Sequence, residues 1–130
     1  MVVETPPRHY SIEEYFALEE TTEYRNEYRN GEIVPMTVGS INHNQIIVNL
    51  VIALSLVLRE QDYGVYANDV RLWIPRYREY TYPDILIIKD EPVFEGRTDT
   101  VVNPCIIFEV LSKSTSSRDR GDKFTFYRTR

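Results

Sequence analysis

The stretch IIFEVL, residues 106–111, decides the fold of this 130-residue chain. Successive side chains of a strand point to opposite faces, and here both faces are apolar apart from Glu109. This pattern predicts a strand that is covered on both sides, as in an α/β or α+β domain. A carboxylate in the middle of such a strand is costly unless it is paired or coordinates a metal ion.

A second acid repeats the pattern in PDILII, residues 83–88, where Asp84 stands at the start of another apolar strand. If the two strands are neighbours, both carboxylates converge on one spot at the rim of the sheet. Like charges that close raise each other's pKa unless a cation lies between them. Hard oxygen ligands favour Mg²⁺ or Mn²⁺ over zinc. The alternative at this point is a buried acid paired with an arginine, such as Asp84 with Arg71.

The first half of the chain carries clear local signals. The capping-box sequence SIEE, residues 11–14, predicts a short helix over 11–19. Asn30-Gly31 between strand-like flanks predicts a hairpin that pairs residues 27–29 with 32–34. A long helix is expected over 40–60, and because it is apolar nearly all round from Ile46 onward, we expect burial on most of its sides.

Strands follow Gly64, and we expect them near residues 65–73, 82–88 and 106–111. Residues 90–104 contain Pro, Gly and charges, which indicates a loop. The spacing of Phe124 and Tyr127 predicts a helix over 119–130. Strands grouped between helices indicate an α/β or α+β fold with a mixed sheet flanked by helices, preceded by an N-terminal helix and β-hairpin.

Composition restricts the class of protein. Apolar residues make up 42% and charged residues 27%, which is typical of a globular protein. The net charge of −5 excludes a protein that coats nucleic acid indiscriminately, but it permits an enzyme with a local basic patch. Residues 113–130 contain six basic and two acidic side chains, a net +4, beside the proposed site.

No export or membrane signal is seen in the sequence. Residues 1–10 lack a basic segment followed by an apolar one. The longest apolar run, 46–58, is shorter than the roughly 20 residues that a membrane span needs. The single cysteine, Cys105, cannot form an internal disulfide, which points to a reducing compartment. We therefore expect a cytoplasmic protein.

Several motifs together resemble the Uma-two family of endonucleases, within the PD-(D/E)XK restriction-endonuclease-like superfamily. In the C-terminal half the matching residues are YPD at 82–84, FEVLS at 108–112, Ser114-Thr115, DRGDKF at 119–124 and Tyr127. In the N-terminal half they are Glu27 ahead of GEIV at 31–34, Met36, His43 and DVR at 69–71. The resemblance implies a core of helix, three strands, helix and strand, with a divalent metal at the strand rim.

The resemblance also implies a set of site residues. Asp84 and Glu109 would be the metal-binding carboxylates for Mg²⁺ or Mn²⁺, and the carbonyl of Val110 would complete the site. The superfamily expects a lysine two residues after the acid, but Leu111 stands there. Lys123, on the following helix, is the replacement that the resemblance suggests. Lys113 is closer in sequence but lies in a polar loop.

Two further residues belong to the matching motifs. Glu27 would be a third acid at the strand rim, and its alternative is an exposed strand residue that pairs with Arg25 or Arg29. His43 is expected in a cap or surface role at the start of the long helix.

The implied function is metal-dependent hydrolysis of DNA by an endonuclease or nickase, which in this superfamily is often a homodimer. The metal would polarise the phosphate and lower the pKa of a bound water, while Lys123 would stabilise the developing negative charge. The alternative is a catalytically inactive module on the nuclease fold that binds DNA or a protein partner, and a third hypothesis is a structural dimer with internally paired acids.

The resemblance implies that the chain is shorter than the family core. The family core continues beyond the Lys123 helix into a further strand, whereas this chain ends within or just after that helix. We therefore expect residues 1–130 to form a single nuclease-like domain that is shortened at its C-terminus. The strand that covers one sheet edge would be missing, which predicts a marginal fold or a partner at that edge.

Overall fold

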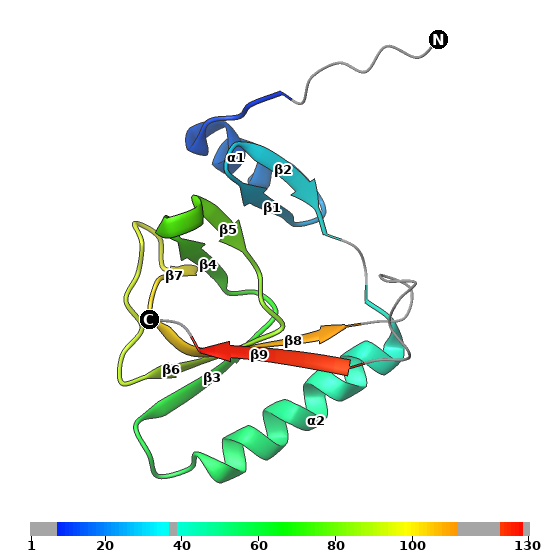
Figure 1. Cartoon of the computed structure of the whole chain (residues 1–130), viewed down its shortest axis with the longest axis vertical. Coiled ribbons are helices and arrows are strands. Elements are labelled where there is room, and N and C mark those ends of the chain that lie inside the picture. The colour runs from blue at the N-terminus through cyan, green and yellow to red at the C-terminus, as the bar shows by residue number, and fades with distance from the viewer. Residues whose placement is uncertain (1–7, 37–38, 112–122, 129–130) are drawn as a thin grey trace. The chain divides into compact units, whose positions relative to one another are not determined.

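The computed structural model describes residues 8–36, 39–111 and 123–128 (Figure 1). The chain divides into two compact units, residues 1–37 with 73–81 and residues 38–72 with 82–130. The boundary falls inside β4 (Arg71–Ile74), whose first two residues belong to the second unit.

The first unit begins with α1 (Ile12–Glu19), which starts where the capping box predicted. The Ser11 hydroxyl accepts the N–H of Glu14 at 3.1 Å, and the Glu14 carboxylate accepts the N–H of Ser11 at 3.0 Å. This second bond is the main reason that the pKa of Glu14 lies below its usual value. Two of the backbone donors at the start of the helix are thus satisfied locally.

The predicted hairpin is present as β1 (Asn26–Arg29) and β2 (Glu32–Pro35), with Tyr28 opposite Ile33. Asn30 and Gly31 both have positive φ, 47° and 96°, as the twist-matched two-residue turn requires. A further strand, β5 (Glu79–Thr81), follows the short 3₁₀ helix η1 (Pro75–Tyr77) and pairs with β1.

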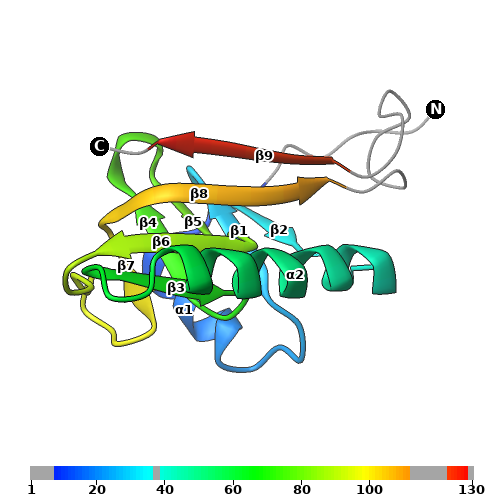
Figure 2. The same ribbon diagram turned by 90° about the horizontal axis from the view of Figure 1, so that it is seen from below.

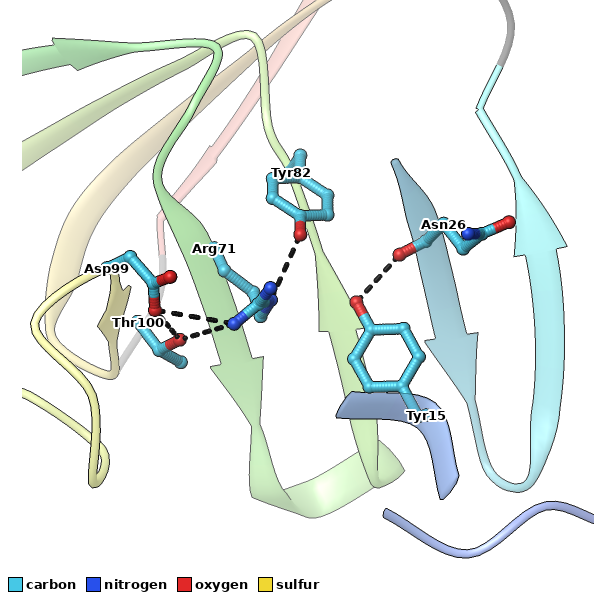
Figure 3. A network of polar contacts seen from close by, with 6 residues as sticks. All are labelled: Tyr15, Asn26, Arg71, Tyr82, Asp99 and Thr100. Atoms are coloured by element: carbon cyan, nitrogen blue, oxygen red, sulfur yellow. Dashed lines mark hydrogen bonds and ion pairs between the residues drawn. The ribbon is translucent and has the colours of Figure 1, made fainter. Parts of the chain in front are cut away.

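Tyrosines form the core of this unit. Tyr15, Tyr28 and Tyr80 are buried together, and the hydroxyl of Tyr15 donates to the carbonyl of Asn26 at 2.7 Å (Figure 3). Tyr28 donates to the carbonyl of Tyr10 at the same distance. Each ring therefore fills apolar volume while its hydroxyl finds a partner.

The second unit is built on a four-stranded antiparallel sheet in the order β3-β6-β8-β9. These strands are β3 (Tyr63–Ala67), β6 (Ile85–Lys89), β8 (Pro104–Leu111) and β9 (Lys123–Arg128). The helix α2 (Ile41–Val57) runs along one face, where Ile47 packs with Ile85 and Val110 (Figure 2). Residues 85–88 are all buried, which confirms that β6 is covered on both faces.

The same unit pairs Arg71 and Leu72 of β4 in parallel with β7 (Thr100–Val101). Helices and sheets thus give the mixed α+β architecture that the sequence predicts.

The single strand predicted over 65–73 is wrong in detail, because β3 and β4 are separate strands. The chain turns between them at Asn68, which adopts a left-handed conformation with φ 66°. Asparagine tolerates this conformation better than most residues, since its short polar side chain bonds locally. Apolar residues stand on both sides of the polar pair Asn68-Asp69, so the loose alternation over 65–73 did not reveal the turn.

The helix predicted over 119–130 is also wrong within the described residues, because 123–128 form β9. This strand pairs along β8, with Glu109 opposite Thr125 and Val110 opposite Phe124 (Figure 1). The sequence KFTFYR is rich in aromatic and β-branched residues that favour strands. It forms the outer strand of the sheet, beside β8. Residues 119–122 lie outside the described part of the chain.

The burial expected for α2 is likewise only partly correct. Ile47 is buried, but the opposite side of the helix exposes Val48, Ile52, Leu56 and Val57, between 43% and 71%. No Asp, Glu, Lys or Arg interrupts the 17 residues of this helix. Its high overall apolarity therefore reflects one packed face and one apolar face turned to solvent. Among the helices of the described residues, none has the length and apolarity needed to cross a membrane.

We predict that the core of the second unit is sensitive to single methyl groups. Ile85 is fully buried in the cluster with Ile47 and Val110, so Ile85→Val should lower the free energy of unfolding by about 0.5–1.5 kcal/mol. Urea denaturation measures this loss. The matched control is Ile41→Val, because Ile41 is 87% exposed and should change stability by less than about 0.5 kcal/mol. Equal losses in both variants would contradict the assignment.

Candidate active site

The two acids singled out by the sequence stand at neighbouring backbone positions at one end of the β6–β8 ladder. Ile85 pairs with Phe108, so Asp84 precedes β6 where Glu109 continues β8. The two strands are neighbours, which is the condition that convergence of the two acids required. Opposed residues of antiparallel strands have Cα atoms about 4.5–5.5 Å apart, so two carboxylates at this place can share one ligand.

The carboxylate of Asp84 is fixed by the backbone of β8. Its Oδ2 accepts the N–H of Val110 at 2.6 Å, a short charge-assisted hydrogen bond. The side chain therefore occupies the place where the next ladder bond from β6 would be. The carbonyl of Asp84 in turn accepts the N–H of Asn68 at 3.2 Å, which anchors its main chain to the turn after β3.

His43 of α2 approaches the same place. Its backbone N–H donates to the hydroxyl of Ser40 at 3.0 Å, so Ser40 is the N-cap of α2 and His43 does not have the cap role that we expected. The side chain of His43 contacts both β8 and Asp84. Its Nε2 lies 2.9 Å from the carbonyl oxygen of Val110 and 3.3 Å from Oδ2 of Asp84. Because both neighbours accept hydrogen bonds, Nε2 carries the proton.

Sequence reasoning underrated His43, because a histidine near a helix N-terminus is most simply explained as a surface residue. Its side chain is only 16% exposed and that of Asp84 only 15%, so the pair is largely withdrawn from water. The signal that could have found it is the coincidence of a histidine in the first turn of an apolar helix with two acids in apolar strands.

The donor set suits a small hard cation. Asp84, just before β6, and Glu109 of β8 both carry hard oxygen donors, and the Val110 carbonyl keeps a lone pair beside the one that His43 uses. Within the described residues no group of three or more His, Cys, Asp or Glu side chains is arranged to hold a metal. Magnesium needs no such cage, because it commonly binds through one or two carboxylates plus waters and substrate phosphates. These residues therefore fit Mg²⁺ or Mn²⁺ rather than a closed zinc site.

Arg71, the alternative partner of Asp84, is engaged elsewhere. Its guanidinium donates to the hydroxyls of Tyr82 and Thr100 and lies beside the carboxylate of Asp99 (Figure 3). Asp84 instead bonds to Val110 and lies against His43. The structure thus lacks the Arg71–Asp84 pair that an internally neutralised acid would require.

The register of β9 places Lys123 directly opposite Leu111. Leu111 occupies the position at which the superfamily resemblance expects a lysine. Lys123 therefore stands one strand spacing, about 4.8 Å, from that position, and it stands on a strand rather than on the helix that we expected. Lys113 lies outside the described residues.

Glu27 belongs to the first unit, where its carboxylate is already held. Arg29 donates to it at 3.0 Å, and the Thr81 hydroxyl donates to its other oxygen. Arg29 also pairs with Glu79 at 3.1 Å. The pKa of Glu79 is raised mainly by burial, although Arg29 lowers it in part. The arrangement matches the alternative of a strand glutamate paired with Arg29.

Comparison with known proteins identifies the family to which the sequence is similar. The sequence model of the family Uma2, described as "Putative restriction endonuclease", matches residues 12–130. Two similar proteins of Synechocystis sp. (strain ATCC 27184 / PCC 6803 / Kazusa), "Uncharacterized protein sll1609" and "Uncharacterized protein slr1290", are 40% and 37% identical over 117 residues. These matches cover 89% and 90% of this chain but 66% and 61% of the two relatives. The chain therefore spans just under two thirds of their length.

A solved structure has a similar fold. It is described as "Crystal structure of a putative nuclease belonging to DUF820 from Anabaena variabilis ATCC 29413" and superposes with a TM-score of 0.53 at 20% identity. The match covers 70% of this chain and 49% of that one. At this level of identity the likeness concerns the fold alone.

We predict that Gly39 is required to leave room for His43. A Cβ at residue 39 would lie 2.8 Å from Nδ1 of His43, so Gly39→Ala must displace the ring. The expected loss is about 1–3 kcal/mol of unfolding free energy, as for other overpacked sites. A double-mutant cycle checks the cause, since Gly39→Ala should cost less than about 0.5 kcal/mol in a His43→Ala background. An undiminished loss there would show that the ring is not what the methyl group strikes.

Proposed function

Because the chain belongs to the Uma2 family of restriction-endonuclease-like proteins, we propose that it hydrolyses phosphodiester bonds of DNA with the help of Mg²⁺ or Mn²⁺. The observation that supports the proposal is the register of β6 and β8, which brings the backbone positions of Asp84 and Glu109 next to each other at one end of the ladder. Two acids with no further function would be a costly arrangement in strands that are otherwise apolar.

In this proposal the chain presents one oxygen of Asp84 while fixing the other. Val110 N–H and His43 Nε2–H both face Oδ2, which leaves Oδ1 to bind the cation together with Glu109. The bound cation would neutralise charge on the phosphate and lower the pKa of a water. Because Oδ2 is held in place, Oδ1 needs little reorganisation when the cation and substrate bind.

Lys123 would supply the positive charge that Leu111 cannot. Its place opposite Leu111 in the β8–β9 register supports this role. In the transition state of phosphodiester cleavage, negative charge develops on the oxygens around phosphorus, and an ammonium group near that point stabilises it. The net charge of +4 over residues 113–130 would help to attract the DNA backbone.

The proposal also includes the predictions on Glu27, the homodimer, the cellular location and the single domain. Glu27 is a predicted third acid, although Arg29 and Thr81 already hold its carboxylate. A homodimer is predicted, and the uncharged apolar side of α2 is a surface where two copies could meet without burying charge. The cytoplasmic location is in keeping with the free thiol of Cys105. The single nuclease-like domain over 1–130 also stays a prediction.

We expect the two carboxylates to be essential for cleavage. Asp84→Asn and Glu109→Gln each remove a negative ligand with little change in shape, so nicking of supercoiled plasmid in Mg²⁺ or Mn²⁺ should fall about 100-fold or more. The control is Asp62→Asn, an exposed aspartate of the same unit, which should leave the rate unchanged. Cleavage that survives both substitutions would overturn the assignment. An intact protein that binds DNA but never cuts it would favour the inactive module instead.

The choice of lysine is tested separately. Lys123→Ala should reduce the nicking rate about tenfold to 1,000-fold without abolishing Mn²⁺ binding, since the ammonium acts on developing charge rather than on the metal. Lys113→Ala is the matched comparison, because it removes the same charge from the neighbouring polar segment. A larger loss for Lys113→Ala would move the role to that residue.

A further inference from the structure

A buried arginine cluster lies next to the segment that carries Asp84. The side chain of Arg71 is only 8% exposed, and Thr100 is fully buried. Nε of Arg71 donates to the hydroxyl of Tyr82 at 3.1 Å, while Nη1 donates to the Thr100 hydroxyl at 3.1 Å and lies 3.3 Å from Asp99 (Figure 3). A buried guanidinium is costly unless most of its donors are satisfied, which this cluster achieves.

The cluster joins two parts of the second unit. The backbone of Arg71 is fixed by β4–β7 pairing and by its N–H, which donates to the carbonyl of Asp99 at 2.9 Å. Its side chain then reaches across to Tyr82, with the guanidinium carbon 5.4 Å from the ring centre. The loop that ends at β7 is therefore connected through one side chain to the residue two positions before Asp84.

Residues 82–84 are held from both directions. Tyr82 is bonded by Arg71 on one side, and Asp84 is bonded by Val110 and Asn68 on the other. Pro83, between them, is fully buried and has its φ fixed by its ring. A segment of three residues with a rigid centre transmits a displacement at one end to the other, because few backbone torsions are left to absorb it.

We propose that Arg71 is a positioning residue for the Asp84 carboxylate and acts through the hydroxyl of Tyr82. The metal-binding consequence rests on the proposed function, whereas the positioning itself does not. The competing explanation is that the cluster only adds stability to the unit. The two explanations differ in where the loss of one hydrogen bond is felt.

The test compares two variants that each remove one hydroxyl from the cluster. Tyr82→Phe breaks the bond that leads toward Asp84, and Thr100→Val breaks a bond on the far side of Arg71. Amide hydrogen exchange of Val110 reports on the position of Asp84, because Oδ2 is the acceptor of that N–H. The amide of Ile87, buried in the middle of β6, serves as the internal reference for a general loss of stability.

Tyr82→Phe should speed exchange at Val110 about three- to tenfold relative to Ile87, as expected for a weakened local hydrogen bond. Thr100→Val should change both amides in proportion. The proposal is overturned if Tyr82→Phe leaves the ratio unchanged, or if the two variants shift it equally. These measurements are made on the metal-free protein, so they do not depend on catalysis.

A calorimetric titration with Mn²⁺ adds the second readout. Tyr82→Phe should weaken binding about three- to tenfold, below the 10- to 100-fold typical of groups bonded directly to a ligand. Thr100→Val should bind as the unaltered protein does. Failure of the unaltered protein to bind Mn²⁺ would contradict the proposed function but leave the exchange result standing, whereas unchanged affinity in Tyr82→Phe would overturn the link between Arg71 and the metal site.

Discussion

The hydrogen bond from the N–H of Val110 to the carboxylate of Asp84 is the interaction on which the second unit depends. β6 begins at Ile85, so no backbone carbonyl continues the ladder beyond that residue. A side-chain carboxylate takes its place at 2.6 Å. The carbonyl of Val110 accepts a hydrogen bond from His43. The backbone N–H and the carbonyl of Val110 are therefore both bonded to side chains of other segments. A strand end, a helix start and the segment at 82–84 thereby meet at one residue.

This arrangement explains how a half-buried negative charge is tolerated. Charged groups are expelled from apolar surroundings unless donors surround them, and here a backbone N–H and an imidazole N–H both face Oδ2. Both donors lie on the same oxygen, so the carboxylate is asymmetric. One oxygen is thus fixed by contacts of the fold, and in the proposed function the other would bind the cation.

Much of this could be predicted from the sequence because the signals are local. The Ser11–Glu14 box, the Asn30-Gly31 turn and the apolar strands each depend on a few adjacent residues, and acids in apolar strands are improbable without a reason. The sequence-based predictions were wrong where contacts between distant segments determine the local structure. Phe124 and Tyr127 fit a helical spacing, but the available edge of β8 favours a strand. The position of His43 against Asp84 depends on how α2 packs on the sheet, which no short-range pattern encodes.

The exposed side of α2 has a consequence for how this protein responds to salt. Its solvent-facing Val48, Ile52, Leu56 and Val57 lie on a helix without Asp, Glu, Lys or Arg, so any association through them is driven by apolar burial. Such association strengthens in sulfate and weakens on cooling. Binding to a nucleic-acid backbone behaves in the opposite way with salt, because it gains from counterion release. A rise in sulfate concentration would therefore strengthen any self-association through this side of α2 and weaken any contact with a polyanion.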